Sequence, residues 1–226
     1  MDPRAPWSEP NTVRGFAQGR PNPVLMQWIG REAAAVGRPL LVADIGCGAG
    51  RNAVPIAETG HAVVGVDLSR AMLDAALART RDHALNGRAH WLLSPADALP
   101  LASARFDVVI AHGIWNLSRS SDEFRRGVRE AARVARSGAL LFVFTFSRHT
   151  LPESVMPVAG ETFVFTQFSG QPQCFLTADE LIGELAAAGF AHEPGTTLQE
   201  YNRPAPGALS SGAPVIWEAV FRRQPS

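Results

Sequence analysis

Three closely spaced glycines and a carboxylate about twenty residues later are the residues of this chain best suited to hold a ligand. Gly46, Gly48 and Gly50 follow one short apolar run, and a second apolar run ends at Asp67. Glycine has no Cβ, so its backbone can lie against a ligand and adopt positive φ. Asp67 stands 21 residues after Gly46, close to the spacing of about 20 that nucleotide-binding folds use for a ribose-binding carboxylate. The pattern predicts a site for a small molecule that contains a nucleoside.

The glycine spacing separates two kinds of nucleoside ligand. Dinucleotide-binding turns usually read G-x-G-x-x-G, but Arg51 stands where the third glycine would be. The run 44–50, DIGCGAG, instead resembles motif I of the class I S-adenosylmethionine-dependent methyltransferases. Segments 67–69, 95–101 and 106–111 resemble further motifs of that family in the same order, so the resemblance covers roughly residues 40–145. The small-molecule group of this family includes quinone- and thiopurine-type enzymes. Within that group, the run GRN at 50–52 followed by GH at 60–61 is similar to the tellurite-resistance type.

The resemblance implies that S-adenosylmethionine is the cofactor, and it assigns roles around the turn. The backbone of Gly46, Cys47 and Gly48 would lie against the methionyl and ribose portions, and Asp44 would orient the turn or hold the ammonium group through water. Asp67 would accept both ribose hydroxyls, since a carboxylate has two oxygens that can accept in parallel. The structural alternatives are a strand-end carboxylate at Asp44 and, at Asp67, a charge that stabilises the start of the next helix.

The resemblance also assigns an adenine site. Leu68 would pack on the adenine face, Asp97 would accept the adenine amino group, and the Ala98 N–H would reach a ring nitrogen. The alternative for Asp97 is a capping carboxylate in the loop that follows a strand.

His112 and Trp115 follow the strand expected over 106–111, at the edge where doubly wound sheets bind ligands. Their segment replaces the Asn/Asp-Pro-Pro-aromatic motif of methyltransferases that act on amino groups of adenine or glutamine, which argues against those substrates. His112 would also contact the cofactor, and an unperturbed histidine pKa near 6.5 makes it a candidate base for a hydroxyl or thiol acceptor. The alternative is that His112 only shapes the pocket. Trp115 either forms a wall of the acceptor pocket or belongs to the core.

Residues 147–176 are expected to cover the acceptor site, because this fold usually places such material after the fifth strand. Arg148 and His149 stand at the end of that strand, where they would meet an anionic or protic acceptor. The aromatic run 163–168 either lines an apolar pocket or belongs to the core.

Composition excludes several other classes of protein. Basic and acidic residues balance at 21 each, so the charge gives no reason to expect nucleic acid or an anionic membrane as a partner. Every basic residue is arginine, so no lysine is present to act as a base or Schiff-base nucleophile. Cys47 and Cys174 are the two cysteines, and a reduced, cytoplasmic setting without disulfides is expected. No signal peptide, membrane span or metal-ligand cluster is predicted.

The expected fold class is α/β, a Rossmann-like, seven-stranded and mostly parallel sheet with helices on both faces and a C-terminal antiparallel hairpin. Apolar runs predict strands over 40–45, 62–67, 89–93, 106–111, 139–146, 196–201 and 215–222. Capping and stop signals predict helices over 22–37 and 50–59, after Ser69, after Ser120, and over 181–188. The Pro/Gly/Ser-rich stretch 204–214 is expected to be a loop.

Residues 1–21 lack a clear hydrophobic period and are predicted to form a flexible arm before one methyltransferase domain over 22–226. Trp7 and Phe16 stand out in this arm. They either anchor it on the domain surface or form a lid that excludes water from the cofactor.

These observations predict methyl transfer from S-adenosylmethionine to a small-molecule acceptor by in-line displacement. Tellurite- or selenite-type acceptors stay open, whereas an arsenite acceptor would need more cysteines than this chain has. One alternative is a catalytically silent cofactor-binding or regulatory protein. Another is a nicotinamide-dependent oxidoreductase, which the glycine spacing disfavours. The acceptor and the oligomeric state stay undetermined, because one fold serves many chemistries.

Overall fold

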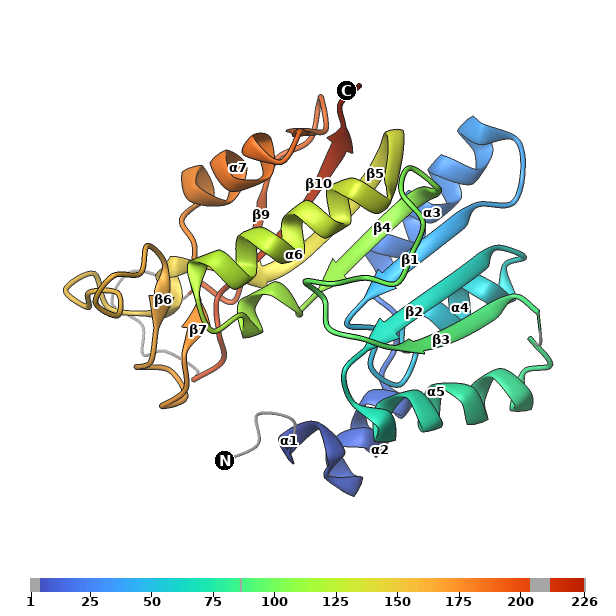
Figure 1. Cartoon of the computed structure of the whole chain (residues 1–226), viewed down its shortest axis with the longest axis horizontal. Helices are drawn as coiled ribbons and strands as arrows, with labels where there is room; N and C mark the ends of the chain where they lie inside the picture. The colour runs from blue at the N-terminus through green and yellow to red at the C-terminus, as the bar shows by residue number, and fades with distance from the viewer. Residues whose placement is uncertain (1–4, 86, 204–211, 226) are drawn as a thin grey trace.

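The computed structural model describes residues 5–85, 87–203 and 212–225 (Figure 1). Its centre is a sheet in the order β3-β2-β1-β4-β5-β10-β8, with β9 also paired to β10. The strands are β1 Leu41–Ile45, β2 Ala62–Asp67, β3 Ala89–Leu93, β4 Phe106–His112, β5 Ala135–Phe146, β8 Phe190–His192, β9 Gln199–Tyr201 and β10 Ile216–Arg223. The first five run parallel, and β10 runs antiparallel to β5. The predicted α/β class and its antiparallel end are confirmed.

Helices cover both faces of the sheet (Figure 1). The main helices are α3 Pro23–Val36, α4 Ala53–Glu58, α5 Arg70–Asp82, α6 Ser121–Val134 and α7 Ala178–Ala187. Buried side chains of α6 and α7 pack with Ile45, Val109 and Val143 on one face. Those of α3 and α4 pack with Val108 and Ile110 on the other. The central strands are therefore apolar on both faces, which is why they read as near-continuous apolar runs.

The outer edge of the sheet differs from the predicted hairpin in one respect. β9 pairs with the start of β10, through Ile216 and Tyr201, as a hairpin would. β8 pairs with the other end of β10, through Phe221 and His192. Two short strands thus share the seventh position, and the strand predicted over 196–201 is confined to its last three residues. Most of the predicted loop 204–214 lies outside the described residues.

Local rules explain most of the element boundaries. Asn22, Ser69, Ser120 and Thr177 each accept the backbone N–H three residues later, as N-caps do. The helix predicted to begin at residue 50 begins at Ala53, because Gly50 has φ +74° and cannot join a right-handed helix.

The N-terminal arm is helical where it is described, although its sequence has no clear period. α1 spans Ala5–Ser8 and α2 spans Pro10–Gln18, and both lie beside α5 (Figure 1). Pro10 fits the first turn of α2, where an N–H would have no helical partner. The prediction missed these helices because α2 buries none of its residues and so carries no core-facing stripe.

Candidate functional site

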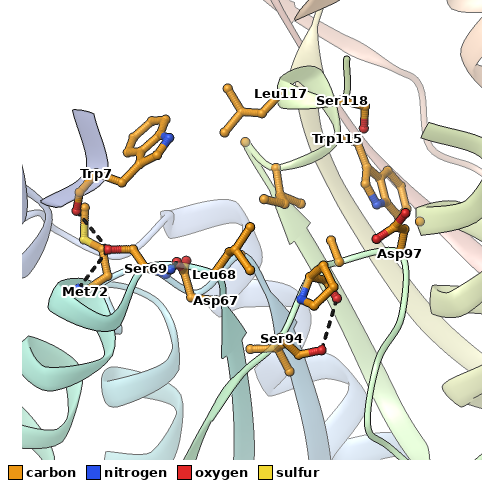
Figure 2. A pocket seen from close by; sticks show the side chains of 18 of the residues that line it. Trp7, Asp67, Leu68, Ser69, Met72, Ser94, Asp97, Trp115, Leu117 and Ser118 are labelled. Atoms are coloured by element: carbon orange, nitrogen blue, oxygen red, sulfur yellow. Dashed lines mark hydrogen bonds between the residues drawn. The ribbon is translucent and has the colours of Figure 1, made fainter. Parts of the chain in front are cut away.

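A cavity opens at the carboxyl ends of β1, β2 and β4, where the strand order reverses between β1 and β4. Its wall comes from the N-terminal arm, the glycine turn, the end of β2, the loop 94–97, the segment 112–119 and the start of α6. Figure 2 shows Trp7 on one side of this cavity and Asp97 and Trp115 on the other, with Leu117 and Leu68 between them. This location is the one at which open α/β sheets bind ligands.

The glycine turn has the backbone geometry that its sequence predicts. Gly46, Gly48 and Gly50 have φ values of +71°, +53° and +74°, a region that side-chain-bearing residues rarely adopt. The N–H groups of Gly46 and Cys47 donate to the Val66 carbonyl at 2.7 and 3.1 Å, which ties the turn to β2. A Cβ on Gly46 would lie 2.6 Å from Cβ of Ile114, so the turn is closely packed and has no room for a side chain at this position.

Asp67 is the carboxylate that faces this turn across the cavity. Its Oδ2 accepts the Gly48 N–H and its Oδ1 accepts the Ser69 N–H, both at 2.8 Å. Burial raises the pKa of Asp67, while these backbone N–H groups oppose the rise. Each oxygen keeps a second lone pair for a ligand donor. Its neighbour Leu68 is 44 % exposed and lines the cavity.

Asp44 and Cys47 lie behind the turn and are not among the described residues that line the cavity. Asp44 is 2 % exposed, and its Oδ2 has no hydrogen-bond partner in the described part of the chain. Burial raises the pKa of Asp44 from 3.8 to about 7; Arg51 opposes this rise and Asp67 adds to it. Burial likewise raises the pKa of the Cys47 thiol. Both side chains are therefore buried, and neither reaches the wall of the cavity.

Of the three residues predicted at the adenine end, Leu68 and Asp97 line the cavity and Ala98 does not. Asp97 lines the wall, and its Oδ2 accepts from Nε of Arg126 at 3.0 Å. Ala98 is absent from the described lining residues, and its N–H donates to the Pro95 carbonyl at 3.4 Å. The Ala98 carbonyl accepts from the Ser94 hydroxyl at 2.8 Å, so both of its backbone groups are engaged within the loop.

His112 lines the cavity with both ring nitrogens close to other side chains. Its ring stacks on Phe144 at 4.1 Å between centroids. Nη2 of Arg51 lies 3.0 Å from Nδ1, and a guanidinium can only donate, so Nδ1 accepts and the ring proton is on Nε2. Nε2 lies 3.4 Å from Nδ2 of Asn22. Burial and then the Arg51 charge lower the pKa of His112 to about 3. This geometry favours the pocket-shaping interpretation over a free base.

Sequence reasoning missed both side chains that lie next to the His112 ring. The sequence draws attention to Arg51 as the residue at a glycine position and within the GRN run, and to Asn22 as a helix cap. Their separations from His112, 61 and 90 residues along the chain, give no local signal.

The residues predicted to meet the acceptor separate into two groups. Trp115 lines the cavity, is 1 % exposed and packs edge-on against Phe124 at 5.8 Å. Arg148 and His149 are not among the described lining residues. The Arg148 guanidinium donates to the carbonyls of Leu151, Pro152, Glu153 and Val155. Nδ1 of His149 lies 2.6 Å from a carboxylate oxygen of Glu200. Both side chains therefore hold the chain after β5 together.

The segment expected to cover the acceptor site does not reach the cavity, since none of its residues is among the described lining residues. It contains the short helix η2 Arg148–Thr150 and the strand pair β6 Val164–Phe165 and β7 Gln173–Cys174. Phe163 is 1 % exposed and packs against Phe124 at 5.1 Å. Phe165 is buried as well, so these aromatics belong to the core.

The N-terminal arm supplies two residues of the cavity wall, Trp7 and Phe16. The sequence left open whether they anchor the arm on the surface or form a lid. Trp7 and Phe16 both line the cavity and contact each other edge-on at 5.8 Å. The Ser69 hydroxyl donates to the Trp7 carbonyl at 3.0 Å (Figure 2). Met72 and Leu117, the last residue of the short helix η1 Trp115–Leu117, also line the cavity. Sequence reasoning did not assign either residue to the site.

The described residues contain neither a cluster of metal ligands nor a membrane-spanning helix. No group of three or more His, Cys, Asp or Glu side chains is arranged to hold a metal ion there. Within the same residues, no helix combines the length and the apolar character needed to cross a membrane.

The family model for the methyltransferase domain matches residues 42–138. This range runs from the glycine turn through β4 to the end of α6, so it contains the cavity's main wall. The chain is 37% identical over 145 residues to the ubiquinone/menaquinone biosynthesis C-methyltransferase UbiE of Dinoroseobacter shibae, a match that covers 62% of this chain and 53% of that protein. The chain thus spans about half the length of this relative.

Two further comparisons extend over more of the chain. The ubiquinone biosynthesis O-methyltransferase of Azorhizobium caulinodans is 27% identical over 195 residues, covering 84% of this chain and 74% of the relative. The fold is similar to the 1,6-didemethyltoxoflavin-N1-methyltransferase of Burkholderia thailandensis, whose structure holds S-adenosylhomocysteine, with a TM-score of 0.64, 22% identity, and 99% and 83% of the two chains covered. In these matches and in the geometry of its glycine turn, the chain is similar to the class I S-adenosylmethionine-dependent methyltransferases.

Proposed function

We propose that this chain transfers a methyl group from S-adenosylmethionine to a small-molecule acceptor. The observation that carries the proposal is the placement of Asp67. Its carboxylate faces the cavity at the switch point, is fixed by the Gly48 and Ser69 N–H groups, and keeps free lone pairs. A ribose diol needs such a pair of fixed acceptors.

The residues present fit this cofactor. A backbone turn of three positive-φ glycines leaves room for the methionyl and ribose portions where side chains would block it. Leu68 and Ile114 line the cavity where an adenine ring needs apolar faces, and Asp97 offers an acceptor for its amino group. We assign Asp44 and Cys47 to support of the turn and leave Ala98 outside direct contact.

When bound, the cofactor supplies a methyl group on a positively charged sulfur, an electrophile that needs no further activation. The protein then has to align the acceptor and exclude water, which can supply roughly 7–11 kcal/mol of barrier reduction. Trp7 and Phe16 lie where they would exclude water. His112 is a positioning residue in this proposal, because its Nδ1 lone pair is occupied by Arg51.

The acceptor is expected to be a small molecule with substantial apolar surface. Trp7, Phe16, Met72 and Leu117 form an apolar side of the cavity, and the relatives described above are named for steps in ubiquinone or menaquinone biosynthesis. The buried free thiols of Cys47 and Cys174 fit the cytoplasmic location that we propose.

The first experiment is calorimetric titration of the purified protein with S-adenosylmethionine, S-adenosylhomocysteine and NADH. Micromolar binding of the two sulfur compounds, without binding of NADH, is the expected result. Absence of binding by either sulfur compound would overturn the proposal. The protein is then incubated with methyl-labelled S-adenosylmethionine and a set of small-molecule acceptors. Transfer of the label to any of these acceptors distinguishes an enzyme from a silent binding protein.

A further inference from the structure

A carboxylate without a cationic partner lies on the sheet face opposite α6, away from the wall of the cofactor cavity. Glu218 is on β10, and it is 4 % exposed. Its Oε2 accepts from Nδ2 of Asn22 at 2.6 Å, and its Oε1 accepts from the Tyr201 hydroxyl at 2.9 Å. It forms no ion pair among the described residues. Both partners are neutral, so its negative charge is uncompensated there.

Of the other three buried carboxylates of the described chain, Glu32 and Asp107 have arginine partners, whereas Asp44 forms no ion pair there. Asp107 is held by Arg38 and Arg136 at 2.8 and 2.6 Å. Glu32 of α3 pairs with Arg222 of β10 at 2.9 Å. Buried charges are generally paired in this way, because an unpaired charge away from water is costly. Glu218 lies on β10, as Arg222 does, but no arginine pairs with it among the described residues.

Glu218 also lines a cavity, which we call the Glu218 cavity. It lies between α3, β10 and the connection from β8 to β9, and its volume is about 280 Å³. Val24 and Trp28 of α3 form an apolar wall, and the exposed residues Thr197 and Gln199 stand at the solvent side. The Trp28 ring already attracts one cation, since the Arg31 guanidinium carbon lies 4.9 Å from its centroid.

The donors and charges of the Glu218 cavity define a class of ligand. Each carboxylate oxygen has one neutral donor and keeps a further lone pair. A protonated amine would supply both the missing positive charge and N–H donors, and aromatic rings such as Trp28 attract ammonium groups. An apolar body on the amine would lie against Val24 and Trp28.

We propose that the Glu218 cavity binds a small molecule through a protonated amine, with Glu218 as its counter-ion. The site is independent of methyl transfer. It is nevertheless close to the cofactor cavity, because Asn22 contacts both Glu218 and His112 through the same nitrogen. One amide group thus separates the two sites.

The test uses benzylamine hydrochloride as the probe and benzyl alcohol as its uncharged counterpart, at pH 7. The indole N–H of Trp28, assigned with Trp28→Phe, is followed by NMR during titration of the full chain. A saturable shift with benzylamine is expected, with binding at least about tenfold tighter than for benzyl alcohol, the difference that one charge-assisted hydrogen bond makes. No saturable shift, or equal shifts for the two probes, would overturn the proposal.

Variants separate the carboxylate from its surroundings. Glu218→Gln keeps the shape and should weaken benzylamine binding by about tenfold or more, while Glu218→Asp, which keeps the charge, should lose less. Glu200→Gln is the matched control, because Glu200 lies on the neighbouring strand, is held by Ser147 and His149, and does not line the cavity. Equal affinity in wild type and Glu218→Gln would exclude Glu218 as the counter-ion. The comparison of benzylamine with benzyl alcohol on the wild-type protein tests the proposed amine site even if a variant fails to fold. Because Trp28 lies outside the cofactor cavity, failure here leaves the S-adenosylmethionine titrations unaffected.

Discussion

Arg51 Nη2 lies 3.0 Å from Nδ1 of His112, so the arginine that replaces the third glycine of a dinucleotide-binding turn also occupies the lone pair of the candidate base. The guanidinium carbon of Arg51 is 6.0 Å from the centre of the Phe16 ring. Arg51 therefore lies between the arm that closes the cavity and the histidine at the end of β4. This contact carries the first prediction, on the protonation of His112.

His112 should remain neutral, with its proton on Nε2, from about pH 8 down to about pH 4, because burial and Arg51 lower its pKa to about 3. Long-range nitrogen–proton NMR spectra of the imidazole ring report both the charge and the tautomer. Arg51→Met should raise the pKa, while Arg14→Met, at an exposed position of the arm, should not. Titration of His112 near pH 6.5 in the wild type would contradict the assignment.

Asp67→Ala should weaken binding of S-adenosylhomocysteine by at least about tenfold, since the loss of one charge-assisted hydrogen bond has that effect. Calorimetry measures the affinity. Asp82→Ala, at an exposed carboxylate on α5, is the control and should leave the affinity unchanged. Unchanged affinity in Asp67→Ala would remove the ribose assignment.

Asp44 should make the protein less stable as pH rises from about 4 to about 7. Its pKa is about 7 when folded and near 3.9 when unfolded, so the unfolded chain releases its proton first and the ionised form is disfavoured in the fold. His112 acts in the opposite direction, because its folded pKa of about 3 lies below its unfolded value and stability falls as pH drops below about 6.5.

The difference between wild type and Asp44→Asn isolates the first effect, because His112 is present in both proteins. Urea unfolding across this range should show the wild type losing stability relative to Asp44→Asn, by up to roughly 3–4 kcal/mol at pH 7. A difference that does not change with pH would show that Asp44 is already ionised at pH 4.

Gly46→Ala should destabilise the protein more than Gly60→Ala does. Both glycines have positive φ, +71° and +97°, but only at Gly46 would a Cβ overlap Ile114. The additional loss in the free energy of unfolding at Gly46 should be about 1–3 kcal/mol, measured by urea unfolding. The double variant Gly46→Ala with Ile114→Gly removes every overlapping atom and should recover part of this additional loss. Equal losses in Gly46→Ala and Gly60→Ala would show that the turn has room to relax.

Trp7→Ala should weaken S-adenosylhomocysteine binding by about three- to tenfold, because the arm then leaves apolar ligand surface in water. Trp28→Ala is the matched control, since Trp28 lies in the Glu218 cavity. Equal affinities for Trp7→Ala and the wild type would show that the arm only packs on the surface.

Local physics explains what the sequence alone determined. The turn glycines, the acid after β2, the N-caps and the apolar central strands follow rules that act over a few residues. They were enough to predict the α/β sheet and its family. They failed at α1, which has four residues, at α2, which buries none of its residues in the core, and at the start of α4, where the conformation of Gly50 excludes a helix.

The tertiary structure decided which side chains meet. Arg51 and Asn22 reach His112 from 61 and 90 residues away, and Glu218 reaches Asn22 across 196 residues. The same long-range packing directs Arg148 toward backbone carbonyls and His149 toward Glu200, away from the cavity. Spacing along the chain could not show these contacts, because they depend on how helices and strands pack together and not on the short-range rules that form each element.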